Sequence, residues 1–319
     1  MIGDRTATIT MSDGSNSLSP ETPPISPTDD RRKRGDWFRW ASSPIAWLGM
    51  VISKLIQSKS ATIGAGIIFF WVFIALATPI IAPYSPTELQ GPRLESPSLE
   101  HWLGTDNIGR DVLSRLFWGT QVVILLAPIS VLLGIMIGAP LGLISGYVGG
   151  RLDAIIMRGV DILLSFPTLL IYILIITSVG ASVLIVVIAI SLGSIPPITR
   201  IVRSLVLDER TKEYVNAARL RGERRHYILL REILPNVSGP IIVDSCIRVG
   251  YAIMAIGALG FLGLGIPPPT PDWGGMINEG RKWIFSMPWM VVAPAIALSS
   301  VVIGLNLLAD GIREIAQKR

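Results

Sequence analysis

The chain has 319 residues; half of them are hydrophobic, only 16% are charged, and the mean hydropathy is +0.56. A typical soluble domain has about a quarter of its residues charged, so this composition excludes an ordinary soluble protein and predicts a membrane protein. The net charge of +5 requires no nucleic-acid partner, because orientation in a membrane explains where the cations lie.

The first 60 residues divide into two parts. Residues 1–36 are rich in Ser, Thr, Pro and Asp and end in a basic run, a composition that predicts a disordered cytoplasmic tail. Residues 37–60 combine tryptophans with basic residues, which predicts an amphipathic helix in the membrane interface. The first long apolar run begins near position 61, so we expect no signal peptide.

Six apolar runs follow, each long enough to cross a hydrocarbon core of about 30 Å as an α-helix. They are continuously apolar instead of alternating, so they are not the strands of a β-barrel. We therefore predict an all-α membrane protein in which residues 61–319 form a domain of six transmembrane helices. The expected spans are 61–82, 121–146, 155–178, 182–202, 239–264 and 288–309, and Pro167, Pro196, Pro197 and Pro294 are expected to mark bends in them.

The basic residues predict the orientation of these spans. If the N- and C-termini are both cytoplasmic, 22 lysines and arginines lie on the cytoplasmic side and 5 lie outside. This orientation makes residues 203–238 a cytoplasmic loop and places residues 83–119 and 265–287 outside.

The two outside segments differ in composition. In residues 83–119, Thr105 or Asp106 is expected to cap a short helix, and the acidic residues there lack the ligand spacing of a calcium loop. Residues 265–287 are dense in proline and glycine, which predicts a lid or a re-entrant element.

The second span carries a regular stripe of small residues. Gly134, Gly138, Gly142 and Gly146 recur at four-residue intervals, a pattern that lets another helix backbone approach closely in lipid. Close packing inside this chain is favoured over a subunit interface.

The spans contain few ionisable groups. Asp161 lies one turn from Arg158, and Asp244 lies four residues before Arg248, so each acid is expected to form an ion pair along its own helix. A proton relay needs acids deeper in the bilayer, which argues against a secondary transporter.

Residues 208–235, DERTKEYVNAARLRGERRHYILLREILP, form a charged, helix-forming segment between two apolar ones. One helix is predicted to have Glu213 in its first turn and to stop just before Gly222, and a second is predicted from about Arg225 to Ile233, where Pro235 ends it. The first helix has a small, lightly apolar face, which predicts docking to another protein. The members of this face are Tyr214, Val215, Ala218 and Gly222.

The sequence shows no bond-making chemistry. It contains neither a phosphate-binding GxxxxGKS/T loop nor a cluster of metal ligands. We therefore expect no enzyme activity and no cofactor in this chain, so any ATP and Mg²⁺ are bound by another subunit.

Three stretches resemble one known family: LGTDNIGRDVLSRL, EYVNAARLRG followed by ILPN, and GFLGLGIPPPTPDWGGMI. They are similar to the transmembrane permease subunits of ABC importers, specifically the C-type permease of the dipeptide and oligopeptide systems. The resemblance covers most of residues 60–319 and implies a type I ABC importer permease fold in the bacterial cytoplasmic membrane. It also implies a second homologous permease, two ATP-binding cassette ATPases and an extracytoplasmic substrate-binding protein as partners, and no nucleic acid.

The loop at 203–238 resembles the EAA loop, through which permeases of this family receive the motion of the ATPases. Asn216 stands where the general pattern has Glu, so the acidic contact of the family is either missing or taken over by Glu213, one turn earlier. The resemblance implies ATPase-coupling roles for nine residues: Glu213, Tyr214, Asn216, Ala217, Ala218, Arg219, Gly222, Leu234 and Pro235.

The function implied by the resemblance is that of one half of a translocation pathway for peptides, driven by ATP hydrolysis in the partner subunits. Three alternatives stay open at the level of sequence. The first is an ABC importer permease for nickel, haem or another small solute. The others are an ATP-independent channel or secondary transporter, and a membrane scaffold subunit.

Overall fold

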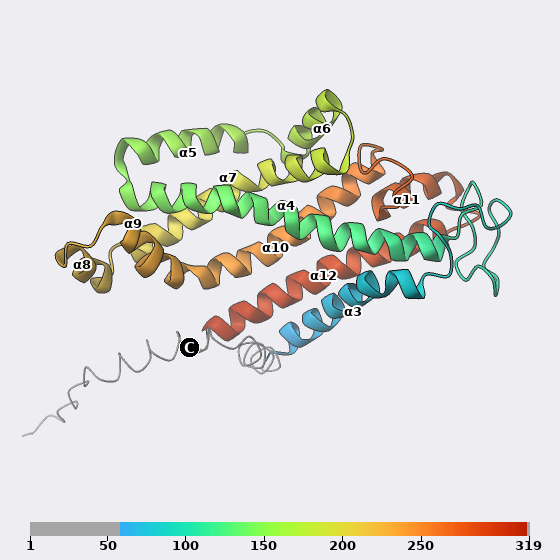
Figure 1. Cartoon of the computed structure of the whole chain (residues 1–319), viewed down its shortest axis with the longest axis horizontal. Helices are drawn as coiled ribbons and strands as arrows, with labels where there is room; N and C mark the ends of the chain where they lie inside the picture. Colours follow the sequence, from blue (N-terminus) through green and yellow to red (C-terminus); the bar gives the residue numbers. More distant parts are fainter. Residues whose placement is uncertain (1–57, 318–319) are drawn as a thin grey trace, which may run out of the picture. The chain divides into compact units, whose positions relative to one another are not determined.

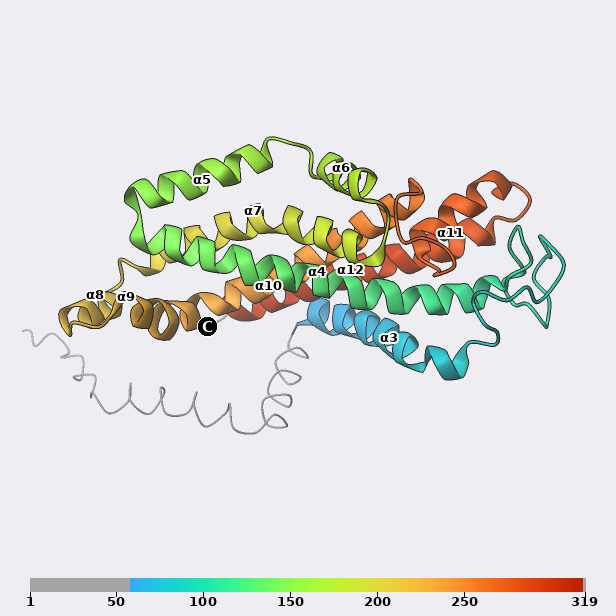
Figure 2. The ribbon, with the colours of Figure 1, turned by 45° about the horizontal axis from the view of Figure 1, so that its top comes forward.

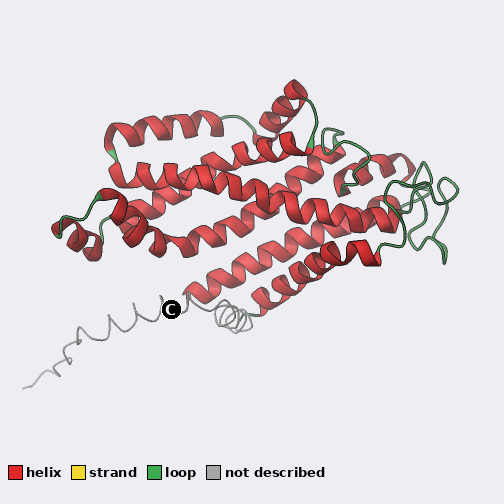
Figure 3. Ribbon diagram, in the orientation of Figure 1, coloured by secondary structure: helices red, strands yellow, loops and turns green. Residues whose placement is uncertain are grey.

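The computed structural model describes residues 58–317, and every regular element in this part of the chain is a helix (Figure 3). The all-α prediction is therefore confirmed. The tail predicted at 1–36 lies outside the described residues, as does the interfacial helix predicted at 37–60 except for its last three residues.

Five helices in the described part are long and apolar enough to cross a membrane. They are α3 (Lys59–Ile81), α4 (Val112–Val148), α7 (Val183–Glu209), the continuous helix Arg225–Phe261, and α12 (Trp289–Gln317). A sixth span is the pair α5 (Gly150–Leu164) and α6 (Thr168–Val179), counted as one broken helix (Figures 1 and 2). The prediction of six transmembrane helices is confirmed.

The third span, expected at 155–178, bends at Pro167 as predicted, and the bend divides it into two helices. Helices α5 and α6 meet at an angle of 81°. Pro167 occupies the N-cap position of α6 with an extended ψ of 121°. Because proline has no backbone N–H and disfavours helical geometry in the residue before it, the helix breaks here.

Helix α4 starts earlier than the span expected at 121–146. It begins at Val112, and the side chain of Asp111 caps it by accepting a hydrogen bond from the N–H of Ser114 at 2.7 Å. The separate short helix predicted after Thr105 or Asp106 is therefore wrong. Residues 112–120 contain no proline, so the helix that starts there continues into the span.

Helices α4 and α7 lie side by side along most of their length (Figures 1 and 2). The four glycines of the stripe in α4 face α7. A Cβ added at Gly142 would lie 2.6 Å from the carbonyl oxygen of Thr199, and one added at Gly138 would lie 2.9 Å from that of Ile195. The stripe thus permits close backbone packing inside this chain.

Two tryptophans join four helices at the core. Trp71 on α3 meets Trp273 edge to face, with 5.1 Å between the ring centroids; Trp273 is the first residue of α11 (Trp273–Gly280). The indole of Trp71 donates to Ser300 on α12 at 2.8 Å, and that of Trp273 donates to the carbonyl oxygen of Leu116 on α4 at 3.0 Å. Both buried N–H groups are therefore satisfied, as large buried indoles require.

The bundle carries different structures at its two ends (Figures 1 and 3). At the α8 end, α8 (Glu213–Leu220) and α9 (Arg225–Tyr227) follow α7. At the α11 end, the irregular segment 82–111 lies near α11 and the 3₁₀ helix Arg281–Trp283.

The second helix of the α8 end does not stop at Pro235, contrary to the prediction. A π-helical stretch, Ile228–Ile233, leads directly into α10 (Leu234–Phe261). Pro235 lies where the π-helical stretch gives way to α10, inside the continuous helix Arg225–Phe261. The proline therefore lies within a transmembrane helix instead of ending a short one.

Candidate functional site

Helix α8 is held to the rest of the chain by its small apolar face. Val215 and Ala218 have no exposed surface and belong to an apolar cluster with Ile228, Ile233 and Val237. Val215 and Ala218 are therefore not free for docking, contrary to the prediction, whereas Gly222 of the same face is exposed. The spacing of this face indicated a buried face, but no local pattern distinguishes a partner protein from neighbouring helices of the same chain.

The opposite side of α8 is exposed. It consists of Glu213, Asn216, Ala217 and Leu220, and Leu220 has 90% of its surface exposed. We call these four residues the exposed face of α8. Because residues three apart are neighbours on a helix surface, an acid at Glu213 lies on the same side as Asn216.

Gly222 sets the end of α8, as predicted. Its φ is +76°, a conformation that a residue with a Cβ rarely adopts. The N–H of Glu223 donates to the carbonyl oxygen of Ala218 at 3.2 Å and closes the last turn. No atom lies within 4 Å of a Cβ added at Gly222, so the requirement for glycine is conformational and not steric.

Tyr214 connects α8 to the two helices that flank it. Its hydroxyl donates to Glu209 at the end of α7 at 2.6 Å and accepts a hydrogen bond from Asn236 at the start of α10 at 3.2 Å. Burial, and then the hydrogen bond to Glu209, raise the pKa of Tyr214. The phenol therefore stays protonated and acts as a link between α7, α8 and α10. Asn236 was not among the residues predicted, although it follows directly on Pro235.

The other predicted coupling residues support α8 from its sides. The guanidinium of Arg219 lies over the ring of Tyr147 on α4, 5.2 Å from its centroid, a cation–π contact. Leu234 packs partly against the buried apolar cluster, and Pro235 is exposed at the start of α10. The nine predicted residues thus divide into an exposed set and a supporting set.

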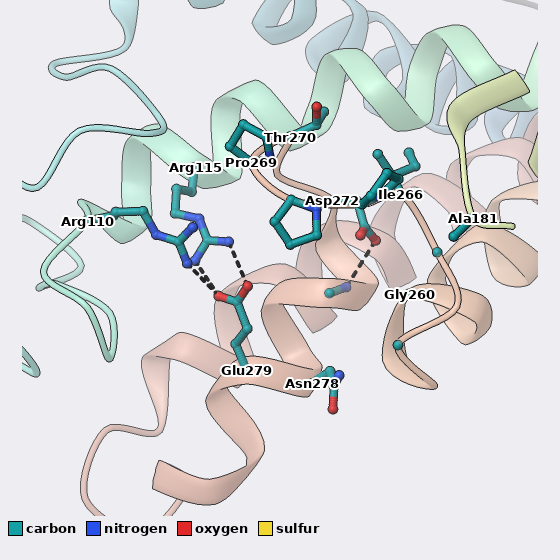
Figure 4. A pocket seen from close by; sticks show the side chains of 15 residues that line it. Arg110, Arg115, Ala181, Gly260, Ile266, Pro269, Thr270, Asp272, Asn278 and Glu279 are labelled. Carbon is teal, nitrogen blue, oxygen red and sulfur yellow. Dashed lines mark hydrogen bonds and ion pairs between the residues drawn. The ribbon is translucent and has the colours of Figure 1, made fainter.

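Four charged side chains form a cluster at the α11 end, and three of them, Arg110, Arg115 and Glu279, are seen in Figure 4. Arg110 and Arg115 each contact the same oxygen of Asp106 at 2.6 Å, and they contact Glu279 on α11 at 2.9 Å and 2.6 Å. The two arginines and Asp106 have side chains no more than 8% exposed. Two cations and two acids make the cluster formally neutral, which offsets the cost of burying each charge.

Asp106 also orders its own loop. One of its oxygens accepts hydrogen bonds from the N–H groups of Ile108, Gly109 and Arg110 at 2.9 to 3.0 Å. Burial raises the pKa of Asp106, but these hydrogen bonds and the charges of the arginines outweigh it, so the pKa is lowered. Asp106 therefore stabilises a turn as an ionised acid and does not cap a helix.

Sequence reasoning did not identify this cluster. Glu279 is separated from Arg115 by 164 positions, and no periodicity connects residues so far apart. The alternating acids and bases of GTDNIGRDVLSR indicated a local charge pattern, but this pattern does not name its partner in the loop at 265–287.

A cavity of about 250 Å³ lies beside the cluster (Figure 4). Arg110, Arg115 and Glu279 line it on one side, and residues 266–269, an isoleucine and three prolines, supply apolar walls. The cavity is thus small and combines apolar walls with a few charged and polar side chains, a combination that is typical of small-molecule sites.

Asp272 lines the same cavity. It caps α11 by accepting a hydrogen bond from the N–H of Gly275 at 3.0 Å, and it is 4% exposed. Burial raises the pKa of Asp272 to about 6, although the N–H groups of Gly275 and Gly274 and the charge of Arg115 lower it. Asp272 therefore changes its charge near pH 6.

The ion pairs expected within the spans have different outcomes. Arg248 contacts Asp244 along α10, as predicted. The pair expected between Asp161 and Arg158 is wrong, because Asp161 instead contacts Arg200 on α7 at 2.6 Å. Helix α5 packs along α7, so the facing helix supplies the cation.

Two family descriptions match this sequence. Residues 138–319 match the family described as "Binding-protein-dependent transport system inner membrane component". Residues 47–97 match the one described as "N-terminal TM domain of oligopeptide transport permease C". The two matches together extend over most of the chain.

Similar proteins have names that refer to transport. The dipeptide transport system permease protein DppC of Alkalihalophilus pseudofirmus is 38% identical over 262 residues, which are 82% of this chain and 86% of that protein. The glutathione transport system permease protein GsiD of Pectobacterium atrosepticum is 41% identical over 220 residues, 69% of this chain and 73% of that protein.

The fold is also similar to a solved structure. A chain of the inward-facing methionine ABC transporter MetNI superposes with a TM-score of 0.54 at 17% identity, covering 64% of this chain and 97% of that one. At this identity the likeness concerns the fold alone. The fold is the type I ABC importer permease fold.

Proposed function

Because the chain belongs to the family of binding-protein-dependent transport system inner membrane components, we propose that it is the transmembrane subunit of an ATP-driven importer of dipeptides and oligopeptides. It is a multi-pass protein of the bacterial inner membrane. In this proposal it forms half of the translocation pathway and catalyses no reaction itself. Its similarity to a dipeptide permease over most of both chains supports the choice of substrate.

The proposed partners are a second, homologous permease subunit, two ATPase subunits and an extracytoplasmic substrate-binding protein. ATP and Mg²⁺ are held by the ATPase subunits, and this chain contributes no cofactor site. The substrate-binding protein selects the solute and delivers it to the α11 end, which this proposal places on the extracytoplasmic side of the membrane.

The exposed face of α8 is the proposed contact with one ATPase. A helix that transmits motion has to be joined firmly to the bundle on one side and free to bind a partner on the other. Val215 and Ala218 are buried, whereas Glu213 and Leu220 are exposed. This division of α8 into a buried and an open face is the observation that carries the proposal.

In the proposed mechanism, ATP binding draws the two ATPases together, and each carries a docked α8 with it. Tyr214 links α8 to α7 and α10, so both helices move with α8 and the pathway switches from inward-facing to outward-facing. Hydrolysis resets the bundle. A ligand shifts such an equilibrium only through a difference in its contacts with the two states, so the ATPase has to hold α8 differently before and after ATP binding.

The acidic contact expected on this surface is assigned to Glu213. Asn216 is neutral and lies one turn further along the same exposed face. In this proposal Glu213 supplies the charge for the ATPase, and Asn216 lies within the interface without forming an ion pair.

Uptake by the complete complex in proteoliposomes tests this function. We expect uptake of labelled Ala-Ala that requires both ATP and the binding protein, and that stops when the ATPases are inactivated. Uptake without active ATPases would instead indicate a channel or secondary transporter. A complex that contains ATPases but moves no solute would indicate a scaffold.

A competition panel tests the substrate class. It contains di-, tri- and longer peptides, glutathione, a nickel chelate and haem, and we expect the short peptides to compete best. Glutathione is the second candidate, because a relative named for its transport is 41% identical to this chain. Competition by nickel or haem but not by peptides would contradict the proposal.

A further inference from the structure

The cavity at the α11 end contains an acid that has no cation of its own. Asp272 is 4% exposed and lines the cavity. Within residues 58–317, no lysine, arginine or histidine is in ion-pair contact with it; the ion pairs of Arg110 and Arg115 are with Asp106 and Glu279. The four members of that cluster neutralise one another, so an ionised Asp272 gives the site a net charge of one negative unit.

Helix capping alone does not account for an aspartate at this position. An asparagine caps a helix about as well as an aspartate and stays neutral, whereas a buried carboxylate without a cation is costly. The side chain lies closely against α10: a Cβ added at Gly260 would be 2.4 Å from Oδ1 of Asp272. A cation that enters the cavity would therefore offset the free-energy cost of burying the Asp272 carboxylate.

A negatively charged ligand fits this site less well. Its natural partners are Arg110 and Arg115, but Asp106 and Glu279 already bind both guanidinium groups. A ligand carboxylate would have to displace Glu279, and it would add a second uncompensated charge beside Asp272. The electrostatics of the cavity therefore favour a cation.

We propose that this cavity binds a primary ammonium group, the amino terminus of a transported peptide, with Asp272 as its counter-ion. The assignment rests on the proposed peptide import, which supplies such a group. Asn278, which also lines the cavity, offers an amide oxygen as a second acceptor, and Ile266 and the prolines that follow it contact the first side chain of the peptide. The volume of about 250 Å³ admits the end of a peptide and not a long chain.

Charge-selective labelling of the cavity in the complete complex tests the proposal. Thr270 lines the cavity and is exposed, so Thr270→Cys in a Cys246→Ser background places a single thiol of this chain there. The probes are a methanethiosulfonate that carries an ammonium group and one that carries a sulfonate, and modification of this chain is read by mass spectrometry. The ratio of the two rates measures the preference of the cavity for a cation.

We expect Asp272→Asn, which retains the cap, to lower this ratio by about threefold or more, because it removes one negative charge. An unchanged ratio would overturn the proposal and leave Asp272 a helix cap only. Absence of labelling in the complete complex, with normal labelling of the separate chain, would show that the partner permease fills the cavity and would also overturn it.

Protection by peptides identifies the group that binds. Ala-Ala should slow the labelling of Thr270→Cys, whereas N-acetyl-Ala-Ala, which lacks the ammonium group, should not; equal protection by both would contradict the proposal. If the complex imports no peptide at all, the proposed function fails, and the labelling ratio with and without Asp272→Asn still reports whether the cavity selects cations. The two failures are therefore distinguishable.

Discussion

The two ends of the bundle use charged and apolar side chains in opposite ways. On α8, the apolar Val215 and Ala218 point inward and Glu213 points outward. At the α11 end, Arg115 and Asp106 are buried and paired with each other. Exposed charges contribute little to the stability of their own chain and stay available to a partner, whereas buried charges hold one arrangement firmly. The α8 end is therefore suited to receive motion, and the α11 end to keep its shape.

The largest effect is expected from Arg115→Ala. This change leaves Asp106 and Glu279 without one of their cations, and breaking a buried ion pair costs about 3–5 kcal/mol. The apparent melting temperature of the purified complex should fall sharply. Arg93→Ala, at an exposed position of the same outside segment, is the matched control, with an expected change within about 0.5 kcal/mol. Similar melting temperatures for both variants would contradict the structural role of the cluster.

Two neighbouring alanines sharpen the comparison within α8. Ala218 is fully buried and Ala217 is exposed. Ala218→Leu should destabilise the protein by about 1–3 kcal/mol, because it overpacks a filled site. Ala217→Leu should leave the melting temperature nearly unchanged and reduce the coupling of ATP hydrolysis to uptake. Equal melting temperatures for the two variants would show that the assignment of the two faces is wrong.

A smaller effect is expected at the end of α8. Gly222→Ala places a Cβ on a residue with φ of +76°, which costs about 1 kcal/mol. Gly159→Ala is the control, because Gly159 lies within α5 in helical conformation with no atom near an added Cβ. Thermal unfolding compares the two. A Gly222→Ala protein as stable as the Gly159→Ala protein would contradict the conformational role of Gly222.

The smallest effect concerns pH at the α11 end. Asp272 faces Arg115 from α4 and Glu279 from α11, with Arg110 beside them, and only backbone groups from α10. With a pKa of about 6, Asp272 becomes charged as the pH rises through this value, so the cation preference in Thr270→Cys labelling should increase. The increase should be absent in Asp272→Asn. A pH profile shared by both proteins would show that another group is titrating.

The same shift has a consequence for stability. A raised pKa means that the folded protein binds the proton of Asp272 more tightly than the unfolded chain does. The protonated Asp272 therefore stabilises the fold fully below pH 3.8, the pKa of the side chain in the unfolded chain. This stabilisation decreases as the pH rises to about 6. As the pH rises from 3.8 to about 6, the melting temperature of the unsubstituted protein should therefore fall relative to that of Asp272→Asn.

The sequence predicted most of the membrane fold because hydrocarbon thickness sets the length of each apolar run. The bend between α5 and α6 was predicted from Pro167, but its size was not, since a proline in an apolar run does not reveal whether a helix kinks or breaks. The early start of α4 was missed because residues 112–120 are less apolar than the span but still helical.

The sites were predicted less completely than the fold. Small residues at helical spacing correctly indicated a special face on α8, but such spacing does not say whether the face packs internally. The pairing of Glu279 with Arg115 and the position of Asp272 depend on the folded loops at the α11 end. No local pattern encodes contacts between segments so far apart in sequence.

The most direct test of the central claim is the number of ATP molecules hydrolysed per dipeptide imported by a complex that carries Leu220→Asp. Leu220 is 90% exposed on α8, and Leu99, 97% exposed in the outside segment, supplies the matched control Leu99→Asp. We expect the ratio to rise at least about tenfold for Leu220→Asp, with the complex still folded, and to stay unchanged for Leu99→Asp. A Leu220→Asp complex that couples ATP hydrolysis to uptake as tightly as the unsubstituted one would contradict the account.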